Sequence, residues 1–275
     1  MSEHLTDTTQ RGRVSVLMYH EISREKLEGG AAHHLTPAYD IPATLFDEHM
    51  SLLARSGFRT PLLQDTTGLD SAAKQVIITF DDGLAGNFAH ALPILQQHGF
   101  RAVFFVAVGA VGKPHYMSWD QLRELCRNGM EVQSHTVSHR PLQTLSQHEV
   151  RQELLNSKTR LEQELRKPVT ALSFPHGSYN DLVVQIAREV GYRTLCTSEV
   201  KRNPVAAFMS EPVILGRIAV TSKFSSQRVR RCAEGNVWEI RRQLAVKQAK
   251  NMVKRVVGIE NYRRMYRKYF NISET

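Results

Sequence analysis

Short runs of apolar and often β-branched residues recur along the chain, and stretches with helical periodicity separate them. The apolar runs cover residues 14–19, 75–80, 102–107, 130–134, 169–174, 192–197 and 212–220. The helical stretches between them cover residues 45–56, 87–98, 118–128, 146–166 and 179–190. Runs that are apolar at nearly every position are typical of strands buried on both faces, and their alternation with helices predicts a parallel α/β fold.

The ends of these helices are marked by capping residues. Ser118 stands before one helical stretch, and Ser146 stands three residues before Glu149, which is the spacing of a capping box. Glycines stand where four of the helices are expected to stop, at Gly57, Gly99, Gly129 and Gly191. These signals support the helical assignment.

Seven strands are one short of a complete eight-stranded β/α barrel. We therefore expect an incomplete or distorted barrel, with an open doubly wound sheet as the alternative. In both architectures the ligand site lies at the carboxyl ends of the strands. The residues that follow each strand are therefore the candidates for chemistry.

The C-terminal part of the chain differs in character from the rest. Residues 228–268 contain 13 Lys or Arg and three Glu, a net charge of +10, whereas the whole chain carries +9. We therefore divide the chain into a flexible N-terminus (1–12), a barrel domain (13–224) and a basic helical extension (225–275). One interpretation of the extension is a helix packed on the barrel with a solvated basic face. The other is a surface that binds anionic lipid or polymer.

The remaining bulk features favour a cytoplasmic protein. The N-terminal residues are polar, no apolar run reaches the length of about 18 residues that a membrane span needs, and the three cysteines form no CxxC pair. We expect free thiols in a reducing compartment, with a peripheral position at the inner face of the membrane as an extension of that expectation. No nucleic-acid recognition motif is present, so no nucleic-acid partner is expected.

Ionisable residues from distant parts of the chain follow the predicted strands. The first strand ends in "MYH", the second in "TFDDG", the fourth in "SHTVSH" and the fifth in "FPHGSY". The residues concerned are His20, Asp81, Asp82, His135, His139, Pro175 and His176, and the last strand adds Arg217. Parallel strands end at one rim, so these side chains are expected to converge.

Each of these signals is weak alone, since "DDG" is a common turn and the chain contains 12 histidines. Two histidines four residues apart can bind one cation, and a carboxylate from another strand completes a three-ligand site that leaves a position open for water. Such a site suits Zn²⁺ or another divalent transition metal. Only one of Asp81 and Asp82 is needed as a ligand, and the other would stand where a general base acts.

The motifs "TFDDG", "SHTVSH" and "FPHGSY", in this order, resemble those of the NodB-type polysaccharide deacetylases, carbohydrate esterase family 4. The resemblance extends over residues 14–220. It implies a distorted (β/α)7 barrel and the removal of acetyl groups from N-acetylated sugars with a divalent metal, usually zinc. A related hydrolase of non-sugar amides, a sugar O-deacetylase, and a non-catalytic carbohydrate-binding or scaffold protein with the same fold are the alternatives.

The resemblance also implies roles for individual residues. Asp81 matches the catalytic base, and the backbone N–H of His176 matches the donor that holds the oxyanion. The imidazole of His176 is expected to line the sugar site. The family's metal ligands are matched by Asp82, His135 and His139, and the substrate contacts are expected from Pro175, Tyr179 and Arg217.

Two positions depart from the family's pattern. Ser173 stands where the family often has an arginine that braces the base, and Arg217 stands where a late histidine often supplies the general acid. A branch with an N-terminal "YH" resembles this chain better, so His20 is the expected acid, with a buried structural histidine as the alternative. Arg217 is then expected either to bracket the base or to bind an anionic group of the substrate.

The expected cytoplasmic location and the basic C-terminal extension narrow the range of expected substrates. A cytoplasmic enzyme would act on a biosynthetic sugar intermediate, including a lipid-linked one at the inner membrane face, rather than on mature wall polymers. The basic extension would approach such a surface. The sequence does not indicate the oligomeric state.

Overall fold

The computed structural model describes residues 12–24, 37–65, 69–70, 72–209 and 211–257. The main sheet is built from β1 (Arg13–Tyr19), β4 (Val76–Phe80), β5 (Val103–Val106), β6 (Glu131–Ser134), β7 (Ala171–Ser173), β8 (Thr194–Cys196), β9 (Asn203–Pro204), β10 (Val213–Leu215) and β11 (Ile218–Ala219). A separate pair consists of β2 (Glu21–Ser23) and β3 (Asp40–Pro42). The first six predicted strands are confirmed, each inside its predicted run except that β1 begins at Arg13.

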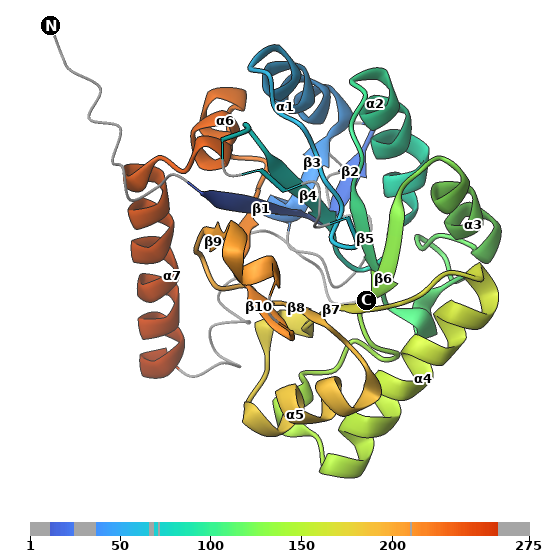
Figure 1. Ribbon diagram of the computed structural model, residues 1–275. Helices are drawn as coiled ribbons and strands as arrows, with labels where there is room; N and C mark the ends of the chain where they lie inside the picture. Colours follow the sequence, from blue (N-terminus) through green and yellow to red (C-terminus); the bar gives the residue numbers. More distant parts are fainter. Residues whose placement is uncertain (1–11, 25–36, 66–68, 71, 210, 258–275) are drawn as a thin grey trace, which may run out of the picture.

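The strands of the main sheet follow the order β10-β8-β7-β6-β5-β4-β1-β11, with all neighbours on this path parallel. β9 pairs antiparallel with the start of β1. Helices surround the curved sheet (Figure 1). The predicted distorted barrel is therefore confirmed, and the alternative of an open doubly wound sheet is wrong.

The seventh predicted strand is divided, and this division nearly closes the barrel. β10 pairs with β8 at one end of the sheet, whereas β11 pairs with β1 at the other end. Between them, the Asn203 side chain bonds both the N–H and the C=O of Gly216, each at 2.9 Å. Arg217 N–H donates to Glu199 O at 2.8 Å. The break therefore arises because these backbone groups find partners outside the ladder.

The helices are α1 (Ala43–Arg55), α2 (Leu92–Gln97), α3 (Trp119–Arg127), α4 (Gln147–Leu165), α5 (Asp181–Val190), α6 (Ser226–Glu234) and α7 (Val237–Val257). Both predicted serine caps are present as complete capping boxes, at the starts of α3 and α4. The predicted helix over 87–98 begins as a π-helical turn, Asn87–Ala91, before α2. This widening precedes Pro93, which has no N–H to donate.

Side chains alternate between the two faces of the sheet and build two cores. One core lies between sheet and helices and includes Leu17, Ile78 and Phe104. The other, with Val16, Ile77 and Phe105, fills the barrel interior. Because strand side chains alternate with a period of two, Ile77 in the second core sets Thr79 and Asp81 on the same inward face. The inward face is thus apolar at one end and polar at the carboxyl end of the strands.

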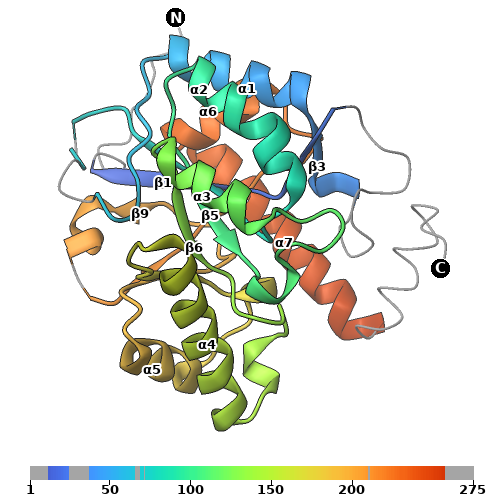
Figure 2. The ribbon, with the colours of Figure 1, turned by 90° about the vertical axis from the view of Figure 1, so that its right-hand side faces the viewer.

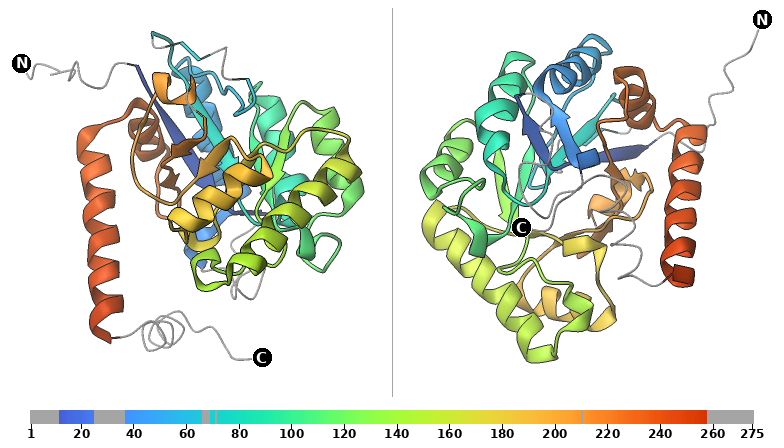
Figure 3. Two further views of the ribbon diagram at one scale, coloured as in Figure 1. Left: turned by 60° about the horizontal axis from the view of Figure 1, so that its bottom comes forward. Right: turned by 180° about the vertical axis from the view of Figure 1, so that it is seen from behind.

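The predicted flexible N-terminus lies almost wholly outside the described residues, as do residues 258–275 of the predicted extension. Within the predicted extension, α6 packs on the barrel through Val229 and Cys232, and Ser15 Oγ donates to Cys232 O at 2.8 Å. α7 runs along one side of the barrel (Figure 3). No described helix has the length and apolar character required to cross a membrane.

Candidate active site

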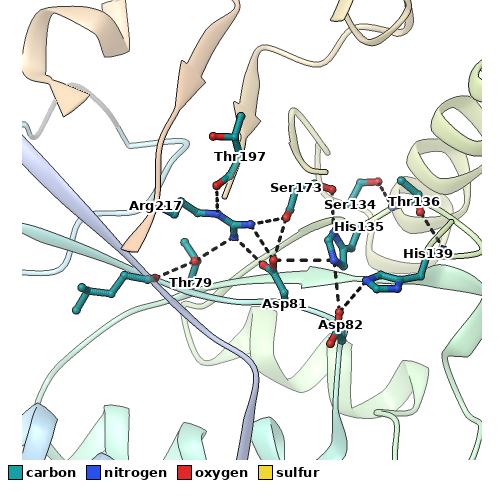
Figure 4. Close-up of polar contacts among 11 residues, drawn as sticks. Thr79, Asp81, Asp82, Ser134, His135, Thr136, His139, Ser173, Thr197 and Arg217 are labelled. Atoms are coloured by element: carbon teal, nitrogen blue, oxygen red, sulfur yellow. Dashed lines mark hydrogen bonds and ion pairs between the residues drawn. The ribbon is translucent and has the colours of Figure 1, made fainter. Parts of the chain in front are cut away.

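Five of the predicted site residues lie together at the carboxyl ends of the strands (Figure 4), namely Asp81, Asp82, His135, His139 and Arg217. Asp81 and Asp82 directly follow β4, and the segment from His135 to His139 directly follows β6. Asp81 N–H donates to Tyr19 O at 3.0 Å, which continues the contact between β4 and β1 beyond the last strand residue. Both aspartates are buried, with exposed fractions of 3% and 5%.

Asp82, His135 and His139 form a three-ligand cluster whose ligand atoms all lie within 4.8 Å of one another. Asp82 Oδ1 lies 3.4 Å from His135 Nε2 and 3.2 Å from His139 Nε2. His135 Nδ1 lies 2.8 Å from Ser173 O, and a carbonyl can only accept, so Nδ1 carries the proton and Nε2 presents its lone pair. This donor set of two imidazoles and one carboxylate fits Zn²⁺ or a related divalent metal.

Several residues at this rim have backbone conformations that are unusual for non-glycine residues. The φ angles of Asp82, Thr136, His139 and His176 are 76°, 68°, 58° and 57°. Each such residue costs roughly 1 kcal/mol or more and persists only where surrounding contacts enforce it. The strain is therefore concentrated on the segments that carry the metal ligands and the proposed oxyanion donor.

The segment from His135 to His139 is held from behind by a buried carboxylate. Glu153 of α4 accepts hydrogen bonds from the N–H groups of Val137 and Ser138, both at 2.9 Å, and from Ser138 Oγ at 2.5 Å. Glu153 is 7% exposed. Its role was not predicted, although a charged residue three positions after Val150 lies on the apolar face of the helix, and this pattern is the signal that could have revealed it.

Asp81 lies 3.9 Å from His135 Nε2 of the three-ligand cluster, but its hydrogen-bond partners are different. Arg217 Nη1 and Nη2 donate to the two carboxylate oxygens at 2.7 and 2.8 Å, and Ser173 Oγ donates to Oδ2 at 3.0 Å. Burial by itself raises the pKa of Asp81, but the charges of Arg217 and His135 outweigh burial, so that the pKa is lowered. Asp81 is therefore ionised and ready to accept a proton.

Arg217 is completely buried, and its guanidinium donors are occupied within the protein. Besides Asp81, it donates to Ser173 Oγ at 2.7 Å, to Thr197 O at 3.0 Å and to Thr79 Oγ1 at 3.3 Å. Of the two roles expected for Arg217, the contacts fit the bracing of the base. Its expected contact with the substrate is not supported, because no part of the side chain is exposed.

Histidines 20 and 176 lie at the edges of this group. The His176 ring is exposed, and its centroid is 4.7 Å from that of the His139 ring. The His20 ring lies 4.6 Å from the ring of Tyr39, and its buried Nδ1 has no hydrogen-bond partner among the residues that the structure describes. Burial lowers the pKa of His20, while the nearby carboxylates of Asp82 and Asp81 oppose that shift. The proton-donor role of His20 stays a prediction.

The two remaining residues expected to contact the substrate lie beside the centre. Pro175 is buried at the start of the short turn Pro175–Gly177. The Tyr179 ring stacks on Phe174 with centroids 5.0 Å apart, and its hydroxyl donates to Glu199 Oε1 at 2.6 Å. Their contacts with a sugar stay predictions.

Comparison with known proteins finds similarity to polysaccharide deacetylases. Residues 69–195 match the family model described as polysaccharide deacetylase. The Bacillus subtilis protein YxkH is 29% identical over 197 residues, which are 70% of this chain and 67% of YxkH. The peptidoglycan-N-acetylglucosamine deacetylase of Bacillus cereus is 30% identical over 127 residues, which are 46% of this chain and 57% of that protein.

A solved deacetylase structure has a fold similar to that of this chain. The deacetylase PplD of Streptococcus pyogenes, determined in complex with acetate, superposes with a TM-score of 0.71 at 26% identity, over 80% of this chain and 98% of PplD. The family match over residues 69–195 contains the motifs "TFDDG", "SHTVSH" and "FPHGSY". The chain is therefore similar to the polysaccharide deacetylases of carbohydrate esterase family 4 in sequence over residues 69–195 and in the fold of its barrel.

Proposed function

We propose that this chain hydrolyses the N-acetyl group of an amino sugar and releases acetate and the free amine. The observation that carries the proposal is the separation of the two adjacent carboxylates into different environments. Asp82 faces the imidazoles of His135 and His139, whereas Asp81 faces Arg217. Similarity to polysaccharide deacetylases supports the same activity.

The metal in this proposal is Zn²⁺ or another divalent transition metal, held by Asp82, His135 and His139. Bound there, it would supply a Lewis acid for the acetyl carbonyl and would lower the pKa of a coordinated water. The protonated Nδ1 of His135 already orients its Nε2 toward Asp82. The unusual φ angles of Asp82 and His139 fit a site shaped before the metal arrives.

Side chains and one backbone N–H of this chain carry out the proton transfers and stabilise the oxyanion. Asp81, kept ionised by Arg217, accepts the proton of the attacking water. The backbone N–H of His176 donates to the developing oxyanion. His20 gives a proton to the departing amine, for which it must be protonated when the substrate is bound.

The substitution Asp81→Asn tests the assignment of the base. We expect acetate release from N-acetylglucosamine oligomers to fall by about a thousandfold, because the amide cannot accept the proton. Zinc content should remain that of the wild type, whereas the matched substitution Asp82→Asn should lose the metal. Full activity in Asp81→Asn would show that the base is assigned wrongly, and faster acetate release from O-acetylated sugars would favour the O-deacetylase alternative.

We also propose that α7 lies on an anionic membrane surface, at the cytoplasmic face. Its first two turns are attached to α6: Glu239 accepts from Arg228 at 3.0 Å and from Arg231 at 2.8 Å, and Gln243 donates to Cys232 Sγ. Beyond them, the described side chains are exposed, so the packed interpretation of this helix holds only near its start.

The exposed part of α7 supports this membrane proposal through its pattern. Trp238 and Met252 are 76% and 67% exposed, and with Ala245 and Ala249 they form one stripe on the side opposite Glu239 and Gln243. The stripe is bordered by exposed arginines, Arg241 and Arg242. An aromatic and apolar stripe between basic residues is typical of a helix that lies in the membrane interface. A second copy of the chain would bring like charges together.

A further inference from the structure

A cavity of about 440 Å³ lies directly over the metal cluster. Asp82 and His139 form part of its wall, so a ligand in the cavity would touch the reaction centre. Its volume is in the range of small-ligand sites. The remaining lining residues are Ala107, Gly109, Ala110, Lys113, Tyr116, Val137 and Ser138.

One wall of this cavity is the segment 108–117, which follows β5 and was not singled out in the sequence. It is bonded to the His135–His139 segment through Val108 N–H to Thr136 O at 3.0 Å and Gly109 N–H to Val137 O at 2.9 Å. A side chain at Gly109 would meet Val137 O at 2.7 Å, so the two segments are in close contact.

The same segment is bonded to the residues that follow Asp82. Met117 N–H donates to Gly83 O at 3.0 Å, and Ala85 N–H donates to His115 O at 2.9 Å. Within the segment, Gly112 N–H donates to Met117 O at 2.9 Å. Backbone hydrogen bonds therefore hold segment 108–117 against both the residues that follow Asp82 and the His135–His139 segment. Its side chains have defined positions beside the three candidate metal ligands.

Lys113 gives this wall a positive charge. It is the single lysine or arginine among the residues that line the cavity. The lining contains one carboxylate, that of Asp82, which is committed to the metal cluster. Among the described residues, Lys113 forms no ion pair. Burial and the carboxylates of Asp82 and Glu21 raise the pKa of Tyr116 to about 12, so its hydroxyl stays a neutral donor in the same wall.

We propose that Lys113 forms an anion subsite next to the metal centre, so that the substrate is an N-acetylated sugar with a phosphate or carboxylate group beside the reacting unit. This inference rests on the proposed function. Tyr116 supplies the neutral aromatic wall for the sugar, and Lys113 pairs with the anionic oxygen atoms. Neutral oligomers of N-acetylated sugars lack a partner for this charge.

Binding to zinc-loaded Asp81→Asn protein tests the subsite without turnover. Dissociation constants are measured by calorimetry for N-acetylglucosamine 1-phosphate, N-acetylmuramic acid and neutral diacetylchitobiose. With Lys113→Ala, we expect the preference for the anionic sugars over diacetylchitobiose to fall by about fivefold, and with Lys113→Glu to fall further. The effect should shrink as salt is added. A preference restricted to one anionic sugar identifies phosphate or carboxylate as the recognised group.

Lys167→Ala is the matched control, because Lys167 is exposed between α4 and β7 at the opposite end of the strands. It should leave the preference unchanged. The proposal is overturned if Lys113→Ala and Lys113→Glu leave the preference unchanged, or if the anionic sugars bind no better than diacetylchitobiose in the parent protein. Since binding is measured without turnover, a failure of acetate release would count against the proposed function and not against the subsite.

Discussion

Arg217 supplies the positive charge beside Asp81 that the family's pattern leads one to expect at position 173. Ser173 occupies the place where the family often has an arginine, and its hydroxyl donates to Asp81 Oδ2 at 3.0 Å but carries no positive charge. The guanidinium of Arg217 reaches the same carboxylate from the break between β10 and β11 and also bonds Ser173 Oγ. The departure from the family's pattern at Ser173 is thus compensated at Arg217.

The substitution Arg217→Lys should reveal this bracing in the pH profile. A single ammonium cannot reproduce the two parallel hydrogen bonds, so the pKa of Asp81 should rise toward the value that burial favours. Because the base must be ionised, the acid limb of the kcat/KM profile should move to higher pH, and the plateau should fall by about tenfold or more. Arg193→Lys, at an exposed pair with Glu211, should leave the profile unchanged. An unmoved acid limb would refute the bracing role.

At the scale of elements, β6 and α4 together set the geometry of the histidine ligands. β6 delivers His135, and Glu153 of α4 holds the backbone between the two histidines. The strand is supported again at its other end, where Glu131 Oε2 accepts from Gln64 N–H at 3.2 Å. One strand therefore carries a ligand at its carboxyl end and a buried structural carboxylate at its amino end.

Glu153→Gln should weaken metal binding without removing a ligand. The amide cannot accept all three hydrogen bonds, so the His135–His139 segment loses part of its support. We expect zinc affinity to fall by about tenfold, measured by competition with a chelator. Glu164→Gln on the same helix, where the carboxylate pairs with Arg123 and Arg160, is the control and should retain affinity. Equal zinc affinity in both variants would contradict this role for Glu153.

Glu131 should make stability depend on pH. Burial raises the pKa of Glu131 to about 7, with hydrogen bonds from the backbone of Gln64 and Leu63 opposing it. The folded form thus holds its proton more tightly, so this stabilisation is complete below the unfolded pKa and is lost as pH rises through about 7. The free energy of unfolding should fall between pH 5 and pH 8 by up to about 3 kcal/mol from this group.

Urea unfolding of wild type and Glu131→Gln at both pH values measures this contribution. The variant should lose less stability than the wild type between pH 5 and pH 8, because glutamine does not titrate. The difference between the two proteins isolates Glu131 from other titrating groups such as Glu21, whose pKa burial raises to about 8. Parallel pH dependence in both proteins would show that Glu131 does not contribute.

At the scale of the whole molecule, the candidate active site and the proposed membrane surface lie on separate parts of the chain. The barrel collects the centre from segments that follow β4, β6, β7 and β8 and from the break after β10 (Figure 4). α7 lies at the edge of this body (Figure 2). α7 leaves this body after its first two turns and exposes its apolar stripe. The proposed membrane surface would therefore be met by a part of the molecule that contributes nothing to the centre.

Vesicle binding tests this division. The double substitution Arg241→Gln/Arg242→Gln should lower binding to vesicles that contain anionic phosphatidylglycerol by about tenfold or more at low salt. Trp238→Ser should also lower it, through loss of the apolar contact. Both variants should release acetate from soluble substrates at the wild-type rate, since neither site lies near the barrel mouth. Equal binding of wild type and variants, or equal binding to neutral vesicles, would refute the membrane proposal.

The sequence by itself determined the helices and strands and the group of polar residues at the carboxyl ends of the strands. Strands, helices and caps follow from local patterns of apolar spacing and hydrogen-bonding side chains, which act within a few residues. Because parallel strands end at one edge, the same patterns also placed Asp81, Asp82, His135 and His139 together. For these residues the chemistry could be predicted from position and type alone.

The tertiary structure decided the partners that these residues find. Arg217 meets Asp81 across 136 positions of sequence, and Glu153 meets the histidine segment from a helix. The sequence left two roles open for Arg217, and the role of Glu153, the split of the last strand and the wall that carries Lys113 were not predicted. Each depends on how the barrel closes and on which side chains then come within bonding distance, and no local pattern in the chain encodes that geometry.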